Sequence, residues 1–232
     1  MKVVFVGPSL PDAESFAGEE VFVCPPAVQG DVLAAVRRGA SVIGLIDGGF
    51  EYTAPVWHKE ILYALSQNVA VLGAASMGAL RAAECQLFGM IGIGRIFHEY
   101  QTGVTVDDSD VALLHGPIDY GYKSLTVPLV NVRATLDKLE SENKLAPAMR
   151  VRLEESASQI FFKERTWQSI IAGCDTASVV PPRKLLSLLV SNAVDQKRAD
   201  ALALLEAVRA ITGSTFDREI SWRMNETYVS SK

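Results

Sequence analysis

A serine stands at the break between a short apolar run and an alanine-rich stretch. Residues 69–73 (VAVLG) are too few for a helix and rich in branched side chains, which predicts a buried parallel strand. Residues 78–88 predict a helix that ends before Gly89. Between them, Ser76 lies in the segment AASMG, which matches the nucleophile elbow G-x-S-x-G with alanine at the first glycine. This pattern indicates a nucleophile, although serine at this place also fits a simple helix N-cap.

Covalent acyl chemistry at such an elbow needs an oxyanion site beside the nucleophile. The backbone N–H of Met77, at the expected helix start, is the natural donor. Gly48 or Gly49, after the neighbouring strand at residues 41–46, would supply a second N–H. The strand–turn–helix arrangement thus provides a nucleophile and a place for the negative charge.

Two further polar residues follow predicted strands. Asp47 comes directly after the strand at residues 41–46, and Ser9 follows the first strand at residues 2–6. Ligands of α/β sheets bind at the carboxyl ends of the strands, so both residues are candidates to bind or orient a substrate. Both also fit ordinary turns, because Asp47 precedes two glycines and Ser9 follows Gly-Pro.

The charged triplet His58-Lys59-Glu60 lies near the start of a predicted helix that runs from an N-cap at Thr53 to about Gln67. That start is expected close to the strand ends carrying Asp47 and Ser76. A charged triplet in a helix is usually a solvated face. Lys59 gains a chemical role only where its side chain points into the cleft.

The remaining pattern alternates strands and helices and then becomes helical. We expect an α/β fold with a small, mostly parallel, Rossmann-like sheet, helices on both of its faces, and a helical C-terminal region. The expected domains are residues 1–126 and residues 127–232, with no linker between them, so one continuous domain also fits. Other predicted elements are strands at 21–24 and 111–114, a turn at 92–94, and helices at 29–38, 127–143, 146–160, 164–172, 183–192 and 195–211.

Composition narrows the function classes. The chain has 232 residues, 49% of them hydrophobic, and its net charge of −5 argues against nucleic acid as a partner. Its apolar runs are too short to span a membrane and its N-terminus lacks the layout of a signal peptide, so we expect a cytoplasmic protein. Three widely spaced cysteines and three unpaired histidines predict no disulfide framework, no metal site and no cofactor.

Several blocks taken together resemble proteins of the TfuA family, over about residues 1–136. They are VGPSL at 6–10, IDGGFE at 46–51, VWHKEILYALSQ at 56–67 and ASMGALRAAE at 75–84, followed by FGM, HGP and VNVRATL. The resemblance implies a partner of YcaO enzymes in the thioamidation of peptide backbones. It implies hydrolysis of the C-terminal thiocarboxylate of a ThiS-like sulfur carrier, release of sulfide, and help for YcaO in engaging its peptide. The family's Ser–Lys pair would fall on Ser76 and Lys59.

A lysine base must be uncharged to accept a proton, which is not its ordinary state at neutral pH. Burial beside Trp57 and the positive charge of Arg81 would favour the neutral amine, and nearby carboxylates would oppose it. A pair between Asp47 and Arg81 would leave Lys59 free to lose its proton. His58 is the alternative base, but its side chain leaves the helix about 100° away from that of Lys59.

Two other functions fit the sequence. The chain could be a non-catalytic adaptor whose elbow only grips the Gly-Gly tail of the carrier, bringing YcaO, carrier and peptide together. It could instead be a sulfurtransferase with a persulfide on Cys24 or Cys85, although Cys85 lies within a small-residue packing face. The sequence does not determine the oligomeric state.

Overall fold

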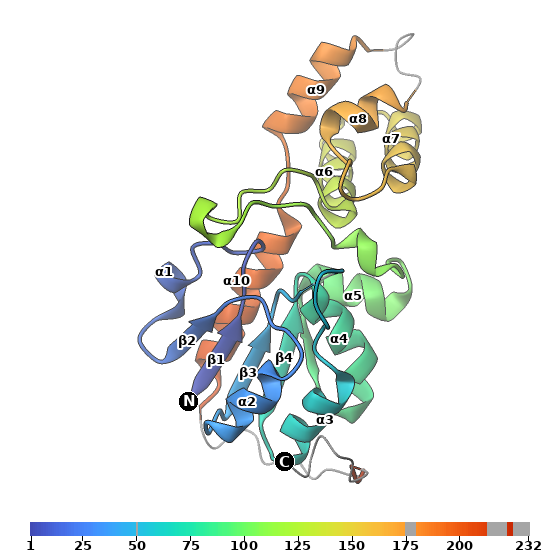
Figure 1. The fold of residues 1–232 in the computed structure, drawn as a ribbon. Helices are drawn as coiled ribbons and strands as arrows, with labels where there is room; N and C mark the ends of the chain where they lie inside the picture. The colour runs from blue at the N-terminus through green and yellow to red at the C-terminus, as the bar shows by residue number, and fades with distance from the viewer. Residues whose placement is uncertain (50, 175–179, 213–221, 225–232) are drawn as a thin grey trace. The chain divides into compact units, whose positions relative to one another are not determined.

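Apolar runs separated by turn residues build a parallel sheet. The computed structural model describes residues 1–49, 51–174, 180–212 and 222–224 (Figure 1). Its sheet has five strands in the order β2-β1-β3-β4-β5, and every neighbouring pair is parallel. The strands are β1 (Lys2–Phe5), β2 (Val21–Cys24), β3 (Val42–Leu45), β4 (Ala70–Ala74) and β5 (Ile91–Ile93). The chain adds β2 on one side of β1 and then β3, β4 and β5 on the other side. The order of strands therefore reverses between β1 and β3, and α/β sheets bind ligands at such a switch point.

Helices cover both faces of the sheet, as the α/β prediction requires (Figure 1). One apolar core joins the strands to α2 (Asp31–Arg37), α3 (His58–Ser66) and α4 (Met77–Cys85). The core of the other face joins them to α1 (Glu14–Ala17) and α10 (Gln196–Ala210). The short helix η1 (Gln86–Phe88) follows α4, and α5 (Gly94–Thr102) follows β5.

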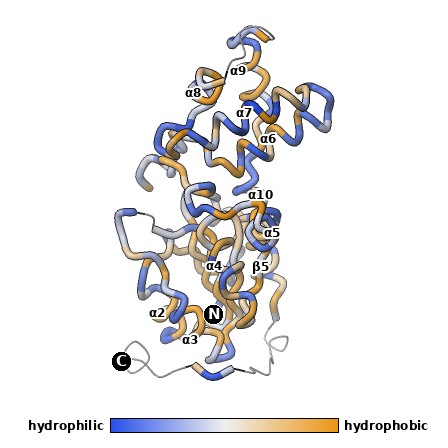
Figure 2. Tube along the Cα trace, turned by 90° about the vertical axis from the view of Figure 1, so that its right-hand side faces the viewer, coloured by the Kyte–Doolittle hydropathy of each residue, from blue (hydrophilic) through white to orange (hydrophobic). Residues whose placement is uncertain are grey.

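The chain divides into two compact units. The first contains Met1–Thr105 and Arg198–Lys232, and the second contains Val106–Lys197. The second unit has its own apolar core among α6 (Leu129–Ser141), α7 (Pro147–Gln159), α8 (Trp167–Ala172) and α9 (Pro182–Ser191). It also holds the short helices η2 (Asp108–Asp110) and η3 (Ile118–Tyr120). Hydrophobic residues concentrate in the strands and in the sides of the helices that pack inward (Figure 2). The domain boundary expected at residues 126 and 127 stays a prediction.

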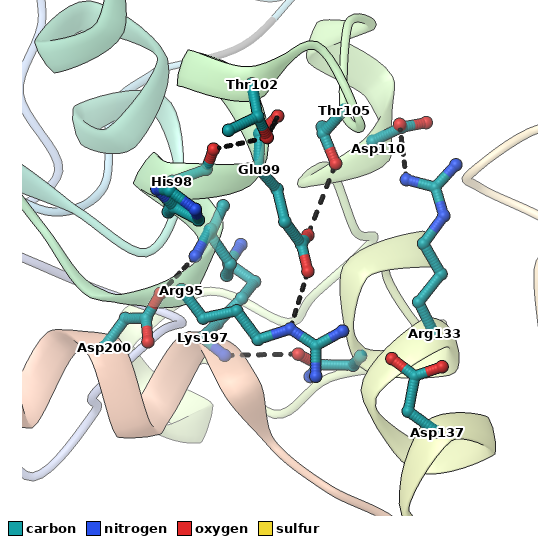
Figure 3. A network of polar contacts seen from close by, with 12 residues as sticks. Arg95, His98, Glu99, Thr102, Thr105, Asp110, Arg133, Asp137, Lys197 and Asp200 are labelled. Carbon is teal, nitrogen blue, oxygen red and sulfur yellow. Dashed lines mark hydrogen bonds and ion pairs between the residues drawn. The ribbon is translucent and has the colours of Figure 1, made fainter. Parts of the chain in front are cut away.

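In each unit, polar side chains near the residues where the chain is divided form hydrogen bonds and ion pairs within that unit (Figure 3). In the first unit, Glu99 pairs with Arg95 at 2.6 Å and accepts a hydrogen bond from the Thr105 hydroxyl at 3.4 Å. In the second unit, the buried Lys197 ammonium donates to the carbonyl oxygen of Val111 at 2.7 Å. Because buried polar groups without partners are costly, these bonds fix the local backbone where the chain passes from one unit to the other.

Two sequence predictions about short strands were wrong. The turn expected at residues 92–94 contains part of β5, whose pairing with β4 shows no periodic signal because the strand has only three residues. Residues 111–114 form no strand. Leu114 instead accepts a backbone hydrogen bond from Leu125 at 2.8 Å, in a short loop with an isolated bridge between His115 and Ser124.

The start of α3 also differs from the prediction. The helix begins at His58, after an extended Trp57 with φ −79° and ψ 145°, and not near Thr53. Pro55 disfavours helical geometry in Ala54, which counts against a helix that starts directly after Thr53. Separately, no helix within the described residues is long and apolar enough to cross a membrane.

Candidate functional site

A strained turn joins β4 to α4. Ala75 has a left-handed φ of 65°, and the N–H of Ser76 donates to the carbonyl oxygen of Ala74 at 2.7 Å. A hydrogen bond across a single residue with positive φ is the pattern of a γ-turn, which is rare and strained. Such strain persists where surrounding structure holds it, and it is frequent at functional sites.

Small residues around this turn allow the helix to lie directly on the sheet. A side chain at Gly78 would overlap the carbonyl oxygen of Leu45, and one at Gly73 would overlap that of Gly78. The N–H of Gly78 donates to the carbonyl oxygen of Ile46 at 3.1 Å, which fixes the start of α4 to the end of β3. The backbone contacts therefore explain why glycines stand on both sides of Ser76.

The hydroxyl of Ser76 does not cap the helix. Ser76 occupies the N-cap position of α4, with φ −128° and ψ −131°, but its side chain makes no capping hydrogen bond. The structure gives its Oγ no hydrogen-bond partner among the described residues, and the residue is 9% exposed. The plain N-cap interpretation thus lacks the bond that would support it, and a free hydroxyl remains at the carboxyl edge of the sheet.

Two backbone N–H groups are available next to the serine. Met77 begins α4, and its side chain packs against Gly48, where a Cβ would overlap the Met77 Cε. Gly49 anchors this loop by donating from its N–H to the carbonyl oxygen of Ala27 at 3.0 Å. Neither the Met77 nor the Gly48 N–H has a hydrogen-bond partner in the part of the chain that the structure describes. A helix N-terminus and uncommitted N–H groups suit a developing negative charge.

The structure brings Asp47 and Ser9 together at the switch point between β1 and β3. The Ser9 hydroxyl donates to Asp47 Oδ1 at 2.6 Å, and the N–H groups of Gly7 and Ser9 donate to Oδ2 at 2.9 Å each. Both Asp47 and Ser9 are 2% exposed. The carboxylate thereby ties the loop after β1 to the backbone that continues into Gly48. The role of Asp47 and Ser9 in binding or orienting a substrate stays a prediction.

Lys59 lies in the first turn of α3, and its side chain is exposed. No hydrogen bond or ion pair to Lys59 is found within the described ranges. The burial beside Trp57 that would help a lysine base is absent, since Trp57 is itself 42% exposed. The structure therefore leaves the Ser76–Lys59 pair as a prediction.

Arg81 and His58 meet at a carboxylate on the outer side of α4. Arg81 donates to the carbonyl oxygen of Val56 at 3.1 Å and pairs with Glu84 at 2.6 Å. His58 Nε2 lies 2.8 Å from the same Glu84 carboxylate. Because Glu84 follows Ser76 by about 12 Å along the helix axis, His58 is held two turns away from the elbow. Arg81 thus positions the start of α3, and the arrangement does not favour His58 as the base.

Sequence reasoning missed Glu60, which is 1% exposed. Both of its carboxylate oxygens accept from the N–H of Gly30 at 2.9 Å, and one also accepts from the N–H of Trp57 at 3.3 Å. Glu60 therefore joins the starts of α2 and α3. A glutamate three residues after the N-cap is typical of a helix start. Because the helix was expected to begin near Thr53, Glu60 was not placed at that position.

A pocket of about 430 Å³ opens between these two helix starts. It is lined by Val28, Gln29, Gly30, Leu33, Thr53, Ala54, Trp57 and Glu60. Gly49 links it to the elbow region, because a Cβ there would overlap the Thr53 side chain. As for metals, the described residues contain no group of three or more His, Cys, Asp and Glu that could hold an ion.

Comparison with known proteins places most of these residues in one matched segment. A family model described as TfuA-like protein matches residues 47–166. The range includes Asp47, Lys59 and Ser76 and leaves out Ser9. No match to the chain is found among curated proteins.

Proposed function

This chain belongs to the TfuA-like family, and on that premise we propose that it hydrolyses the C-terminal thiocarboxylate of a ThiS-like sulfur carrier protein. The released sulfide would serve a YcaO-family enzyme that thioamidates a peptide backbone. The observation that carries the proposal is the Ser76 hydroxyl, which is uncommitted and stands on a strained turn at the start of α4. A serine in this setting is suited to attack an acyl carbon.

The proposed reaction has two steps. Ser76 Oγ attacks the thiocarboxylate carbon while its proton passes to the Lys59 amine, and the N–H groups of Met77 and Gly48 bind the oxyanion. The C–S bond then breaks, and sulfide leaves with the proton returned by Lys59. Water hydrolyses the resulting ester, which gives a carboxylate and restores the serine. Carbon is neither oxidised nor reduced, so no redox cofactor is needed.

The exposed position of Lys59 suits a protein substrate. A carrier seated over the first turn of α3 would remove water from the amine, and loss of water favours the uncharged form of a lysine. The base would then become active only with the carrier bound.

An adaptor without catalysis is the second candidate. It is favoured by one observation, that Lys59 makes no hydrogen bond within the described residues. In that case the elbow grips the Gly-Gly tail of the carrier and presents it to YcaO.

The test is sulfide release from a thiocarboxylated ThiS-like carrier, with mass spectrometry of the carrier. We expect Ser76→Ala to lower the rate about 10³-fold or more, and Lys59→Ala to lower it by about 10²–10⁴. The matched controls are Ser66→Ala and Arg37→Ala, which remove the same kinds of groups from the last residues of α3 and α2. Circular dichroism checks that each variant is folded. Wild-type rates in folded Ser76→Ala would contradict a serine nucleophile, and absence of sulfide release by the wild-type protein would support the adaptor.

A further inference from the structure

The buried Glu60 carries a negative charge that no side chain neutralises. Its two oxygens accept N–H donors from Gly30, Leu33 and Trp57, at 2.9 to 3.4 Å. Donors at both oxygens fit an ionised carboxylate, since a protonated one would turn one oxygen into a donor. Within the described ranges, no lysine, arginine or histidine forms an ion pair with it. Glu60 lines the pocket but is itself 1% exposed, so its negative charge acts on the pocket from just beneath the wall.

The rest of the pocket offers an apolar surface and neutral polar groups. Val28, Leu33 and Ala54 supply the apolar part, and Trp57 adds an indole ring that is partly exposed. The side chains of Gln29 and Thr53 have no hydrogen-bond partner among the described residues. An aliphatic stem would lie against the first group, and a cationic head would lie against the indole face and the neutral polar groups, attracted by the charge of Glu60 beneath them.

The sign of the charge decides which ligand fits. An anionic thiocarboxylate would be repelled by Glu60 and suits the N–H donors of the elbow instead. A carboxylate beside an indole face is the combination that binds an alkylammonium or guanidinium cation. A volume of about 430 Å³ also accommodates a long side chain together with part of its backbone.

We propose that the pocket between the starts of α2 and α3 binds a lysine or arginine side chain of a polypeptide. The inference rests on the proposed function in one respect: the polypeptide is then the substrate chain, and the basic residue precedes its reacting C-terminus. Gly49 contacts Thr53 at the pocket and is adjacent to Gly48 at the elbow, so one extended segment can reach both. The pocket would select chains by a basic residue before the elbow acts on the terminus.

Calorimetric titration tests the binding with three short peptides. They are N-acetyl-Gly-Lys-Gly-amide and the same peptide with arginine or with norleucine, which keeps the stem without the charge. We expect both basic peptides to bind about tenfold or more tightly than the norleucine peptide, with a preference that shrinks as salt rises to about 0.5 M. Equal binding of all three, or no binding of any, would overturn the inference.

Two arginine substitutions distinguish binding at the pocket from attraction to the overall charge of the protein. Ala54→Arg places a guanidinium at the pocket without touching Glu60, and we expect it to abolish the preference for basic peptides. Ala34→Arg adds the same charge at an exposed position of α2 outside the lining, and it should bind like wild type. A retained preference in Ala54→Arg would refute the assignment.

Two more variants complete the test. Glu60→Gln keeps the size of the side chain and should remove the preference wherever circular dichroism shows a native fold. Ser76→Ala should bind the peptides normally, so a failed hydrolase assay and a failed pocket assay are told apart.

Discussion

Cys85 bears on whether sulfur chemistry in this protein runs through a thiol. Burial raises the pKa of the Cys85 thiol to about 11, the neighbouring Glu84 adds to the increase, and Arg81 opposes it. Burial also raises the pKa of Cys24. The thiolate is the reactive form of cysteine, so both residues are poorly suited to carry a persulfide at neutral pH. This favours the serine at the elbow over a sulfurtransferase cysteine.

We predict that Cys85 of the native protein resists iodoacetamide at pH 7 and reacts readily once the chain is unfolded. The folded state holds the thiol proton more tightly than the unfolded state, so the contribution of Cys85 to stability is complete below about pH 9 and is lost as the pH rises toward about 11. Mass spectrometry of alkylated peptides gives the reaction rate, and urea titrations at pH 8 and pH 10 give the stability. Cys85→Ser corrects for other titrating groups. Rapid alkylation of native protein at pH 7 would contradict the prediction.

For individual residues, the sequence pattern predicted Ser76 and the small residues around it, but it did not predict the conformation of the turn. The left-handed Ala75 and the unused hydroxyl of Ser76 depend on how α4 rests against Leu45 and Ile46. Those contacts join segments about thirty residues apart and leave no local signal. The type of residue was therefore predictable, and its geometry was not.

At the scale of elements, the start of α3 shows how a tertiary contact overrides a local one. Thr53 and Pro55 form a reasonable N-terminal signal, yet the helix begins after Trp57 because the Glu60 carboxylate accepts from the backbone of Trp57 and of Gly30, the N-cap of α2. The partner before α2 cannot be read from the sequence around α3. The same contact places the negative charge of Glu60 beneath the wall of the pocket, so the missed helix start and the missed pocket have one cause.

Two substitutions separate the alternative starts of α3. Thr53→Val removes a hydroxyl at nearly constant volume, and we expect the free energy of unfolding to change by less than about 0.5 kcal/mol because Thr53 caps no helix. Glu60→Gln turns one acceptor into a donor that faces N–H groups, and we expect a loss of about 1–3 kcal/mol. Urea unfolding followed by circular dichroism measures both. A loss of about 1 kcal/mol in Thr53→Val would instead indicate an N-cap at Thr53.

At the scale of the whole molecule, the fold class was predictable but the place of the last helix was not. Alternating strands and helices in the first half of the chain require an α/β sheet. The helical pattern at residues 195–211 correctly indicated α10, but it could not indicate that α10 returns to the sheet. There Leu204 fills the space that Gly44 of β3 leaves open. The second unit is thus an insertion between two parts of the first.

Separate cores predict separate responses to mutation. Leu204 is fully buried between α10 and the sheet, and Leu153 is fully buried in the helical core of the second unit. Each leucine-to-alanine change should destabilise its own unit by about 2–5 kcal/mol. Hydrogen exchange read by mass spectrometry should show faster exchange of β1 and β4 in Leu204→Ala, and of α6 and α7 in Leu153→Ala. If either change accelerated exchange equally in all four elements, the two units would unfold as one, and the insertion would be no independent folding unit.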